Sequence, residues 1–199
     1  TSVNKKNKKL IEFLKRKKIS FYQGSENNVL KRYYDAATKN KFKNIIRITG
    51  DCPLVDPALI DQYVKVFKEK KVDYLSNICP PTYPDGLDLE IFTYNTLKKA
   101  YLKAKNKYDL EHVTPYIRSN KTNLFTNANY DAEIDLGFIR MTVDEKADLI
   151  AIRRLIDELG TSSTWEEYVE HIIIHSGSIG NTNIIRNEGY QKSLTKDTK

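Results

Sequence analysis

The strongest constraint on the fold is the stretch NIIRITGDCPLVDP at residues 44–57, in which an apolar run gives way to an abrupt loop and then to a helix start. The run NIIRIT is β-branched and continuous, which predicts a central strand buried on both faces. Asp56 and Pro57 supply the N-cap and first residue of a helix that continues through PALIDQYVKVFKEK. Asp51 is therefore expected in a loop at the carboxyl end of a strand.

Strand and helix patterns alternate along the rest of the chain. Short β-rich runs predict further strands at ISFYQ, VDYLSN, NLFTNAN and FIRMTV. Helical spacing predicts one helix over residues 7–18 and a second over ENNVLKRYYDAATKNK, with Ser25 as its N-cap. A third helix is expected to begin at Asn95, and a fourth covers LEHVTPYIRS. A fifth is expected to end at Gly160, and a sixth to begin after a capping box of Thr164 and Glu167. This order predicts an α/β fold with a mixed, mainly parallel sheet flanked by helices.

Length and composition bound the class of protein. The 199 residues suffice for one core and predict a single domain over 1–199, with a frayed tail at about 190–199. No apolar run is long enough to cross a bilayer, the first residues do not form a signal peptide, and two cysteines make no disulfide framework. A cytoplasmic protein with no membrane partner is expected.

The net charge of +7 raises the hypothesis of a nucleic-acid partner. The lysines, however, are spread along several predicted helix faces, and the sequence contains no recognisable nucleic-acid-binding motif. Attraction of a small polyanion accounts for the charge equally well. No nucleic acid is therefore expected as a partner.

Two carboxylates follow apolar strands at matching places, Asp51 after NIIRITG and Asp144 after FIRMTV. Ligands gather beyond the carboxyl ends of strands in open α/β sheets, and two carboxylates there suit a hard cation such as Mg²⁺ that also binds phosphate oxygens. The alternative is structural: Asp144 can be the N-cap of the following helix, and Asp51 can bind turn amides. The residues alone leave both interpretations open. Cys52 has no neighbouring base in the sequence, so no nucleophile is predicted.

Other polar residues gather in two further segments. Glu111 and His112 are adjacent in DLEHVTPYI, where such a pair can orient a substrate hydroxyl or transfer a proton, or can be hydrogen-bonded and structural. Asp85, Asp88 and Glu90 in PDGLDLE follow a proline-rich loop and can either select the hydroxyl groups of a sugar or be solvated loop acids. Neither segment decides the function by itself.

Seven segments, taken in order, resemble one family far more specifically than any single motif. They are FYQGSENNVLKRYYDAA, RITGDCPLVDP, DYLSN, PPTYPDGLDLEIF, EHVTPYI, RMTVDEKADL and NIIRNEGYQKSL. Together they resemble the cytidylyltransferase-like proteins of spore-coat polysaccharide synthesis, which are related to the synthetases of CMP-Kdo and CMP-sialic-type acids. The resemblance implies a nucleotide-diphospho-sugar transferase (Rossmann-like) fold. It also implies transfer of a cytidylyl group from CTP to an acidic or modified sugar, with Mg²⁺ as cofactor and pyrophosphate as the second product.

The resemblance implies roles for particular residues. Asp51 and Asp144 match the carboxylates that bind Mg²⁺, and Asp51 is expected near the nucleotide as well. Ser25 and Arg32 of GSENNVLKR fall in the segment that lies near the nucleotide. The sugar-side motifs match four residues, Asp85, Glu90, Glu111 and His112. The residues expected to be catalytic are Asp51, Asp144, Glu111 and His112.

One departure from the family concerns the start of the sequence. Family members begin with a strand and a phosphate-binding loop rich in Gly, Arg and Lys, and this sequence is expected to start just after that region. This expectation supports an alternative in which the chain is a truncated, non-catalytic module. Such a module would bind a sugar or a nucleotide, or would have a regulatory role. Homodimerisation is a further implication of the resemblance.

Overall fold

The described residues divide into two units of contiguous packing. The structure, a computed structural model, describes residues 1–175. Of the described residues, unit 1 comprises Thr1–Ile45 and Phe92–Thr126, and unit 2 comprises Ile46–Ile91 and residues 127–175. The predicted tail at 190–199 and the motif NIIRNEGYQKSL lie outside the described residues.

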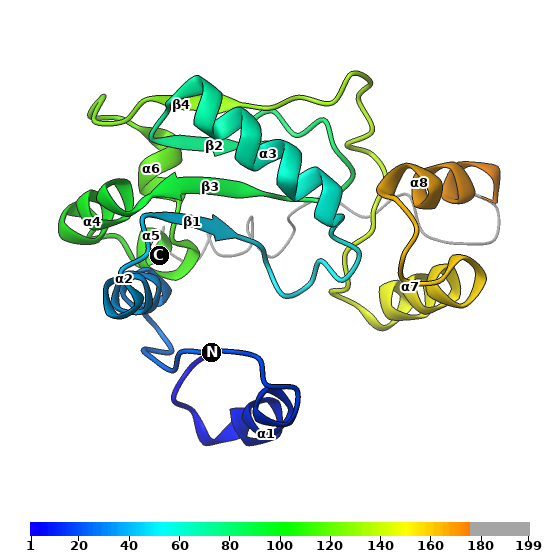
Figure 1. The fold of residues 1–199 in the computed structure, drawn as a ribbon, viewed down its shortest axis with the longest axis horizontal. Coiled ribbons are helices and arrows are strands. Elements are labelled where there is room, and N and C mark those ends of the chain that lie inside the picture. Colours follow the sequence, from blue (N-terminus) through cyan, green and yellow to red (C-terminus); the bar gives the residue numbers. More distant parts are fainter. Residues whose placement is uncertain (176–199) are drawn as a thin grey trace, which may run out of the picture. The chain divides into compact units, whose positions relative to one another are not determined.

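The sheet has four strands in the order β1-β3-β2-β4 (Figure 1). The strands are β1 (Asn44–Arg47), β2 (Tyr74–Ser76), β3 (Glu90–Thr93) and β4 (Asn127–Asn129). Strands β2 and β4 pair in parallel, with Leu75 opposite Ala128. Helices separate the strands in sequence, so the predicted α/β class with helices flanking a sheet is confirmed.

Strand β1 is an edge strand, and the prediction that NIIRIT is buried on both faces is wrong. Strand β1 comes first in the sheet order, and the side chains of Ile46 and the following Ile48 are 39% and 36% exposed. β-Branched residues favour the extended backbone of any strand, so the run predicted the element but not its number of neighbours. Within the described residues, β1 has a strand partner on one side alone.

Two predicted strands do not form in the structure. ISFYQ makes no strand, and the chain beside it is tied by one parallel bridge between Ser2 and Gly24. FIRMTV makes one parallel bridge, from Arg140 to Asp85. A β-prone run becomes a strand only where a partner lies alongside it over several residues, and that pairing is not local information.

Unit 1 consists mainly of helices. They are η1 (Lys5–Asn7), α1 (Lys8–Arg16), α2 (Val29–Asn40), α4 (Tyr94–Lys103), α5 (Lys107–His112) and α6 (Pro115–Ser119). Helix α2 packs against α4 and α5. The predicted N-cap Ser25 is wrong: Asn28 caps α2 by accepting a hydrogen bond of 2.7 Å from the N–H of Lys31, while Ser25 Oγ accepts the N–H of Asn28. Asparagine caps as well as serine does, so the later residue starts the helix.

Unit 2 contains α3 (Pro57–Lys70), α7 (Lys146–Leu159) and α8 (Trp165–Ile174). Helix α3 crosses one face of β2 (Figure 1). Its residues Leu59 and Tyr63 join one core with Leu75 of β2, Ile152 of α7 and Tyr168 of α8. The apolar faces of the three helices therefore meet in a common interior.

The Asp56 carboxylate binds the starts of two helices of unit 2: it is the N-cap of α3, and it also contacts α8, whose N-cap is Thr164 in the predicted capping box with Glu167. Its Oδ1 accepts the N–H of Ala58 at 2.7 Å in the first turn of α3, which confirms the predicted Asp-Pro helix start. Its Oδ2 accepts the N–H of Trp165 at 3.1 Å, at the first residue of α8. A single buried carboxylate therefore fixes the starts of both helices.

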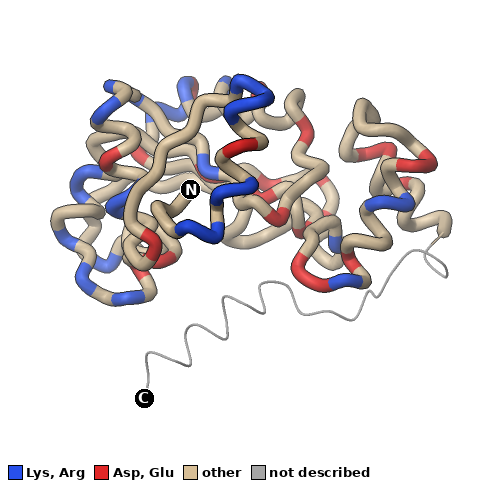
Figure 2. Tube along the Cα trace, turned by 90° about the horizontal axis from the view of Figure 1, so that it is seen from below, with Lys and Arg blue, Asp and Glu red and all other residues tan. Residues whose placement is uncertain are grey.

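Positively and negatively charged residues are both distributed along the described chain. Figure 2 shows Lys and Arg positions spread over separate stretches with Asp and Glu positions between them. Across residues 1–175, every helix is too short or too polar to span a bilayer.

Asn77 holds the loop PDGLDLE against the end of β2. The fully buried Asn77 side chain donates from Nδ2 to the carbonyl of Leu87 at 2.7 Å and accepts the N–H of Leu89 at 2.9 Å. Two loop main-chain groups thus find partners without forming a strand.

Asn77→Ala is expected to lower the free energy of unfolding by about 2–3 kcal/mol, because two buried main-chain groups lose their partners. Urea unfolding followed by circular dichroism measures the change, with truncation of the exposed Gln62 side chain of α3 as the control. A loss no greater than that of Gln62→Ala would show that the loop does not depend on Asn77.

Candidate active site

The loop that carries Asp51 lies against the segment that carries Asp144. The backbone N–H of Val143 donates a hydrogen bond of 2.9 Å to the carbonyl oxygen of Asp51. Because Val143 directly precedes Asp144, the two carboxylates predicted to bind Mg²⁺ belong to adjoining segments of unit 2. The bond joins main-chain atoms, so it does not depend on the side chain at position 51.

Cys52 closes the Asp51 loop as a neutral thiol. Its Sγ lies 3.1 Å from Thr49 Oγ1, and its N–H donates to the carbonyl of Thr49 at 3.4 Å. Burial raises the pKa of the Cys52 thiol to about 12, so the thiol is protonated at neutral pH. A buried, protonated thiol is a poor nucleophile, and no nucleophilic role is assigned to Cys52.

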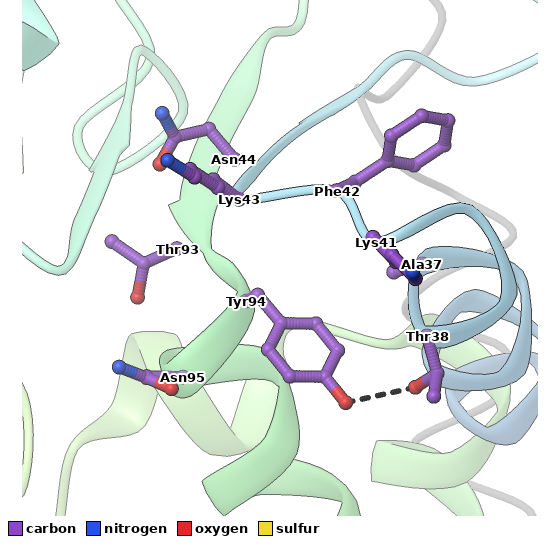
Figure 3. Close-up of a pocket in the computed structure, with 9 residues that line it drawn as sticks. All are labelled: Ala37, Thr38, Lys41, Phe42, Lys43, Asn44, Thr93, Tyr94 and Asn95. Atoms are coloured by element: carbon purple, nitrogen blue, oxygen red, sulfur yellow. Dashed lines mark hydrogen bonds between the residues drawn. The ribbon is translucent and has the colours of Figure 1, made fainter.

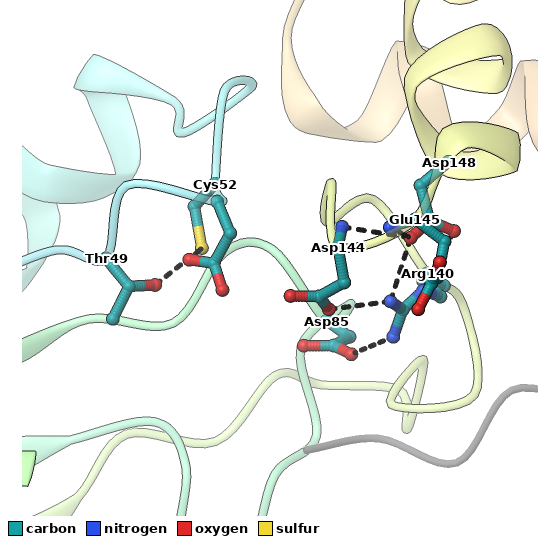
Figure 4. Close-up of polar contacts among 8 residues, drawn as sticks. Thr49, Cys52, Asp85, Arg140, Asp144, Glu145 and Asp148 are labelled. Atoms are coloured by element: carbon teal, nitrogen blue, oxygen red, sulfur yellow. Dashed lines mark hydrogen bonds and ion pairs between the residues drawn. The ribbon is translucent and has the colours of Figure 1, made fainter. Parts of the chain in front are cut away.

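Arg140 connects three aspartates beside this loop (Figure 4). Its Nε and Nη2 donate to the two oxygens of Asp148 at 3.2 and 3.0 Å. Nη2 also donates to Asp144 Oδ2 at 2.7 Å, and Nη1 donates to Asp85 Oδ2 at 3.4 Å. Three negative charges and one positive charge leave the cluster with a net charge of −2. A surplus of negative charge favours a cation at this place.

The alternative role of Asp144 as a helix cap is wrong. The N-cap of α7 is Glu145, and Asp148 completes the capping box by accepting the N–H of Glu145 at 2.9 Å and that of Asp144 at 3.0 Å. Asp148 is the third residue of α7, and its side chain turns back to bind the N–H groups of the N-cap residue and of the residue before it. The Asp144 side chain is 54% exposed and is available for another contact.

The charges of Arg140 and Asp148 are fixed at neutral pH. Burial acts to raise the pKa of the Asp148 carboxyl, but hydrogen bonds from Arg140 and from two backbone N–H groups outweigh it and lower the pKa below its usual value. The hydrogen bond to Asp148 is the main reason why the pKa of Arg140 is raised. The pair is therefore a permanent ion pair over the physiological pH range.

Main-chain contacts place Asp85 beside Arg140. The N–H of Asp85 donates to the carbonyl of Ile139 at 2.8 Å, and the N–H of Met141 donates to the carbonyl of Asp85 at 2.6 Å. Gly86 permits this approach because its φ is +114° and a Cβ there would lie 2.7 Å from the carbonyl carbon and oxygen of Met141. The turn at Asp85 and Gly86 thus brings a buried carboxylate to the cluster.

Glu90 lies in β3 with both carboxylate oxygens bound inside unit 2. The hydroxyl of Tyr74 donates to Oε1 at 2.6 Å, and Arg47 of β1 donates to Oε2. The Glu90 side chain is 2% exposed. These contacts join three strands, and the role of Glu90 in sugar binding stays a prediction.

In unit 1 the structure brings together the two residues predicted near the nucleotide. Arg32 of α2 donates from Nη1 to the carbonyl of Ser25 at 2.9 Å. The guanidinium thereby braces the turn that precedes α2.

Glu111 and His112 end α5, and the predicted continuous helix LEHVTPYIRS is interrupted there. Pro115 begins α6 and has no N–H to donate to the preceding turn, which ends a continuous helical hydrogen-bond pattern. The break separates Glu111 and His112 from α6.

Val113, in this break, has a strained backbone. Its φ of +74° and ψ of −53° are rare for a β-branched residue, and the N–H of Thr114 donates to the carbonyl of His112 at 2.9 Å across it. The fully buried Val113 side chain holds the turn in place. A backbone conformation of this kind costs about 1–3 kcal/mol, and the roles of Glu111 and His112 stay predictions.

The carboxylates fit a metal ion that arrives with a substrate. Within residues 1–175, no three or more His, Cys, Asp or Glu side chains form a group that could hold a metal. Proteins usually hold Mg²⁺ by one or two carboxylates together with water and substrate phosphates. The oxygen donors of Asp51 and Asp144 fit that mode.

A pocket of about 560 Å³ in unit 1 is distinct from the predicted residues (Figure 3). It lies where α2 ends, β1 begins and α4 begins, and its walls include Lys41, Asn44 and Tyr94. The hydroxyl of Tyr94 lies 2.9 Å from Thr38 Oγ1. The site residues predicted in unit 1 do not line it.

Sequence reasoning missed Arg140 and Asp148. Arg140 interrupts the apolar run FIRMTV, and an arginine that is buried in such a run requires a carboxylate partner. The need of Arg140 for a carboxylate partner could therefore have identified it from the sequence. Asp148, four residues after Asp144, is hidden by its position inside the predicted helix.

Comparison with known proteins decides the family. The model of one family, described as Cytidylyltransferase, matches residues 4–163. The chain belongs to the cytidylyltransferase family. The match includes the Asp51 loop and the whole Arg140 cluster, so these features lie within the cytidylyltransferase part of the chain.

Two curated proteins are similar to this cytidylyltransferase family member. An uncharacterised protein of Methanocaldococcus jannaschii is 40% identical over 127 residues, which are 63% of this chain and 50% of that protein. The spore coat polysaccharide biosynthesis protein SpsF of Bacillus subtilis is 32% identical over 142 residues, which are 70% of this chain and 58% of that protein. The chain spans about half the length of the curated relatives it matches.

A solved structure confirms the fold. The structure of a cytidylyltransferase from Leptospira borgpetersenii serovar Hardjo-bovis matches with a TM-score of 0.87 at 30% identity, covering 93% of this chain and 79% of that chain. The resemblance to cytidylyltransferase-like proteins, stated from seven short segments, is confirmed.

Proposed function

We propose that this protein is a Mg²⁺-dependent cytidylyltransferase that transfers CMP from CTP to an acidic or modified sugar and releases pyrophosphate. The similarity to SpsF supports a CMP-sugar destined for surface polysaccharide. The family membership supports CTP as the nucleotide.

The observation that carries the proposal is the hydrogen bond between Val143 and Asp51. It joins the segments that carry Asp51 and Asp144, so the Asp51 loop lies beside a cluster that includes Asp144 and has a net charge of −2. A purely structural loop does not need this concentration of like charge, which raises the energy of the folded state unless a cation binds.

The residues divide into chemical roles. Asp51 and Asp144 would hold Mg²⁺, which when bound offsets the negative charge of the phosphates. A sugar oxygen attacks the α-phosphorus of CTP, and its new bond to phosphorus forms as the bond to pyrophosphate breaks. Chemistry of this kind depends mainly on positioning and charge.

The remaining predicted residues have further roles in this proposal. The Ser25 turn, braced by Arg32, contacts the nucleotide in this proposal. Glu111 and His112 orient the sugar oxygen, and the strained turn at Val113 keeps them in place. Asp85 and Glu90 of unit 2 are the further sugar-side residues.

Calorimetric titration with CTP, UTP and ATP in the presence of Mg²⁺ tests the proposal. CTP is expected to bind with a dissociation constant of about 10–100 μM, at least about tenfold more tightly than UTP or ATP, and EDTA is expected to abolish pyrophosphate release. Pyrophosphate is then measured with CTP and a panel of acidic sugars. Tight CTP binding without pyrophosphate from any sugar would favour a non-catalytic binding module, and no CTP binding would refute the proposal.

A further inference from the structure

Arg140 is fixed in orientation before it meets Asp144. Its Nε and Nη2 bind both oxygens of Asp148, which in turn accepts two backbone N–H groups at the start of α7 (Figure 4). The side chains of Arg140 and Asp148 are 12% and 7% exposed. A bidentate, buried pair of this kind leaves the planar guanidinium no freedom to rotate.

The anchored guanidinium binds one oxygen of Asp144 and leaves the other open. Nη2 donates to Asp144 Oδ2 at 2.7 Å. Among residues 1–175, Oδ1 of Asp144 accepts no hydrogen bond, and half of the side chain is exposed. An exposed carboxylate without such a partner samples several rotamers, whereas Asp144 is held in one.

Arg140 is not placed to bind phosphate itself. Its guanidinium makes four hydrogen bonds to three carboxylates. The surplus charge of the cluster remains negative, so a cation at the open oxygen of Asp144 is still attracted.

We infer that Arg140 is a positioning residue that orients the Asp144 carboxylate for the divalent cation; this inference rests on the proposed function. Carboxylates that bind metals are commonly held by a hydrogen bond to a second residue, and loss of such a partner weakens metal binding by about 10–100-fold. The fork of Arg140, rather than its charge alone, performs this task.

Arg140→Lys tests the inference because it keeps the charge and removes the fork. Mn²⁺ is titrated into the intact protein with CTP, and free Mn²⁺ is measured by electron paramagnetic resonance. The variant is expected to bind Mn²⁺ about 10–100-fold more weakly, with its fold checked by circular dichroism. Arg154→Lys is the matched control, because Arg154 lies on α7 and its ion pair with Glu158 is exposed; its Mn²⁺ affinity is expected to match that of the unaltered protein.

The outcomes separate this inference from the proposed function. Unchanged or tighter Mn²⁺ binding by a folded Arg140→Lys variant would overturn the role of Arg140 and leave the proposed function standing. Absence of Mn²⁺ binding by the unaltered protein with CTP would overturn both. Should Arg140→Lys not fold, the Nε–H signal of Arg140 in the unaltered protein is followed by nuclear magnetic resonance; a shift on saturation with Mg²⁺ and CTP is expected, and an unchanged signal would refute the inference.

Discussion

Asp51→Asn is expected to lower kcat/KM for pyrophosphate release at least about 100-fold while the protein remains folded. The substitution removes one of the two carboxylate charges proposed for Mg²⁺, and loss of fixed charge at a reacting phosphate commonly costs two to three orders of magnitude. The measurement is the initial rate of pyrophosphate release from CTP over a range of Mg²⁺ concentrations.

The fold is expected to survive because the loop is held through main-chain atoms. The carbonyl of Asp51 accepts the N–H of Val143, and its carboxylate accepts a long hydrogen bond of 3.6 Å from Cys52 Sγ. The free energy of unfolding should change by less than about 1 kcal/mol. Asp61→Asn, on the exposed side of α3, is the control for loss of one negative charge. Normal Mg²⁺-dependent activity in Asp51→Asn would show that the metal assignment is wrong.

Gly86→Ala is expected to lower the free energy of unfolding by about 3–4 kcal/mol. The new Cβ would lie 2.7 Å from the main chain of Met141, which cannot rotate away, and the φ of +114° is unfavourable for alanine. Chemical unfolding in urea, followed by circular dichroism, measures the loss.

Gly50→Ala is the matched control for this prediction. A Cβ at Gly50 meets no atom within 4 Å, so the free energy of unfolding should change by less than about 1 kcal/mol. Equal effects of the two substitutions would show that the approach of Gly86 to Met141 does not limit stability.

Local signals in the sequence predicted the elements whose causes are local. Helix α3 runs from Pro57 to Lys70 as predicted, because an aspartate cap and a first-turn proline act within one turn. The environment of β1 could not be predicted in the same way, because exposure of Ile46 depends on which strands lie alongside. Likewise, Ser25 and Asn28 are both good caps, and the choice between them depends on the turn before α2.

The candidate site was predicted in part. Asp51 and Asp144 were singled out by their matching places after apolar runs, and the structure brings their segments together within unit 2. Arg140 was not singled out, although Asp144 and Asp148 lie only four and eight positions later. Its third partner, Asp85, lies 55 positions away in the sequence. A residue whose role is to connect distant segments is visible only when the fold has joined them.

The two hydrogen bonds of Asp56 link distant parts of the chain in another way. The family match ends at residue 163, just before α8 begins at Trp165. Yet the N–H of Trp165 is bound by a carboxylate 109 positions earlier, at the start of α3. Because one side chain serves both helix starts, separation of α8 from the rest of unit 2 would remove the protein partner of Asp56 Oδ2 at the start of α3. Helix α8 is therefore coupled to the stability of the part of the chain that defines the family, although it lies outside that part.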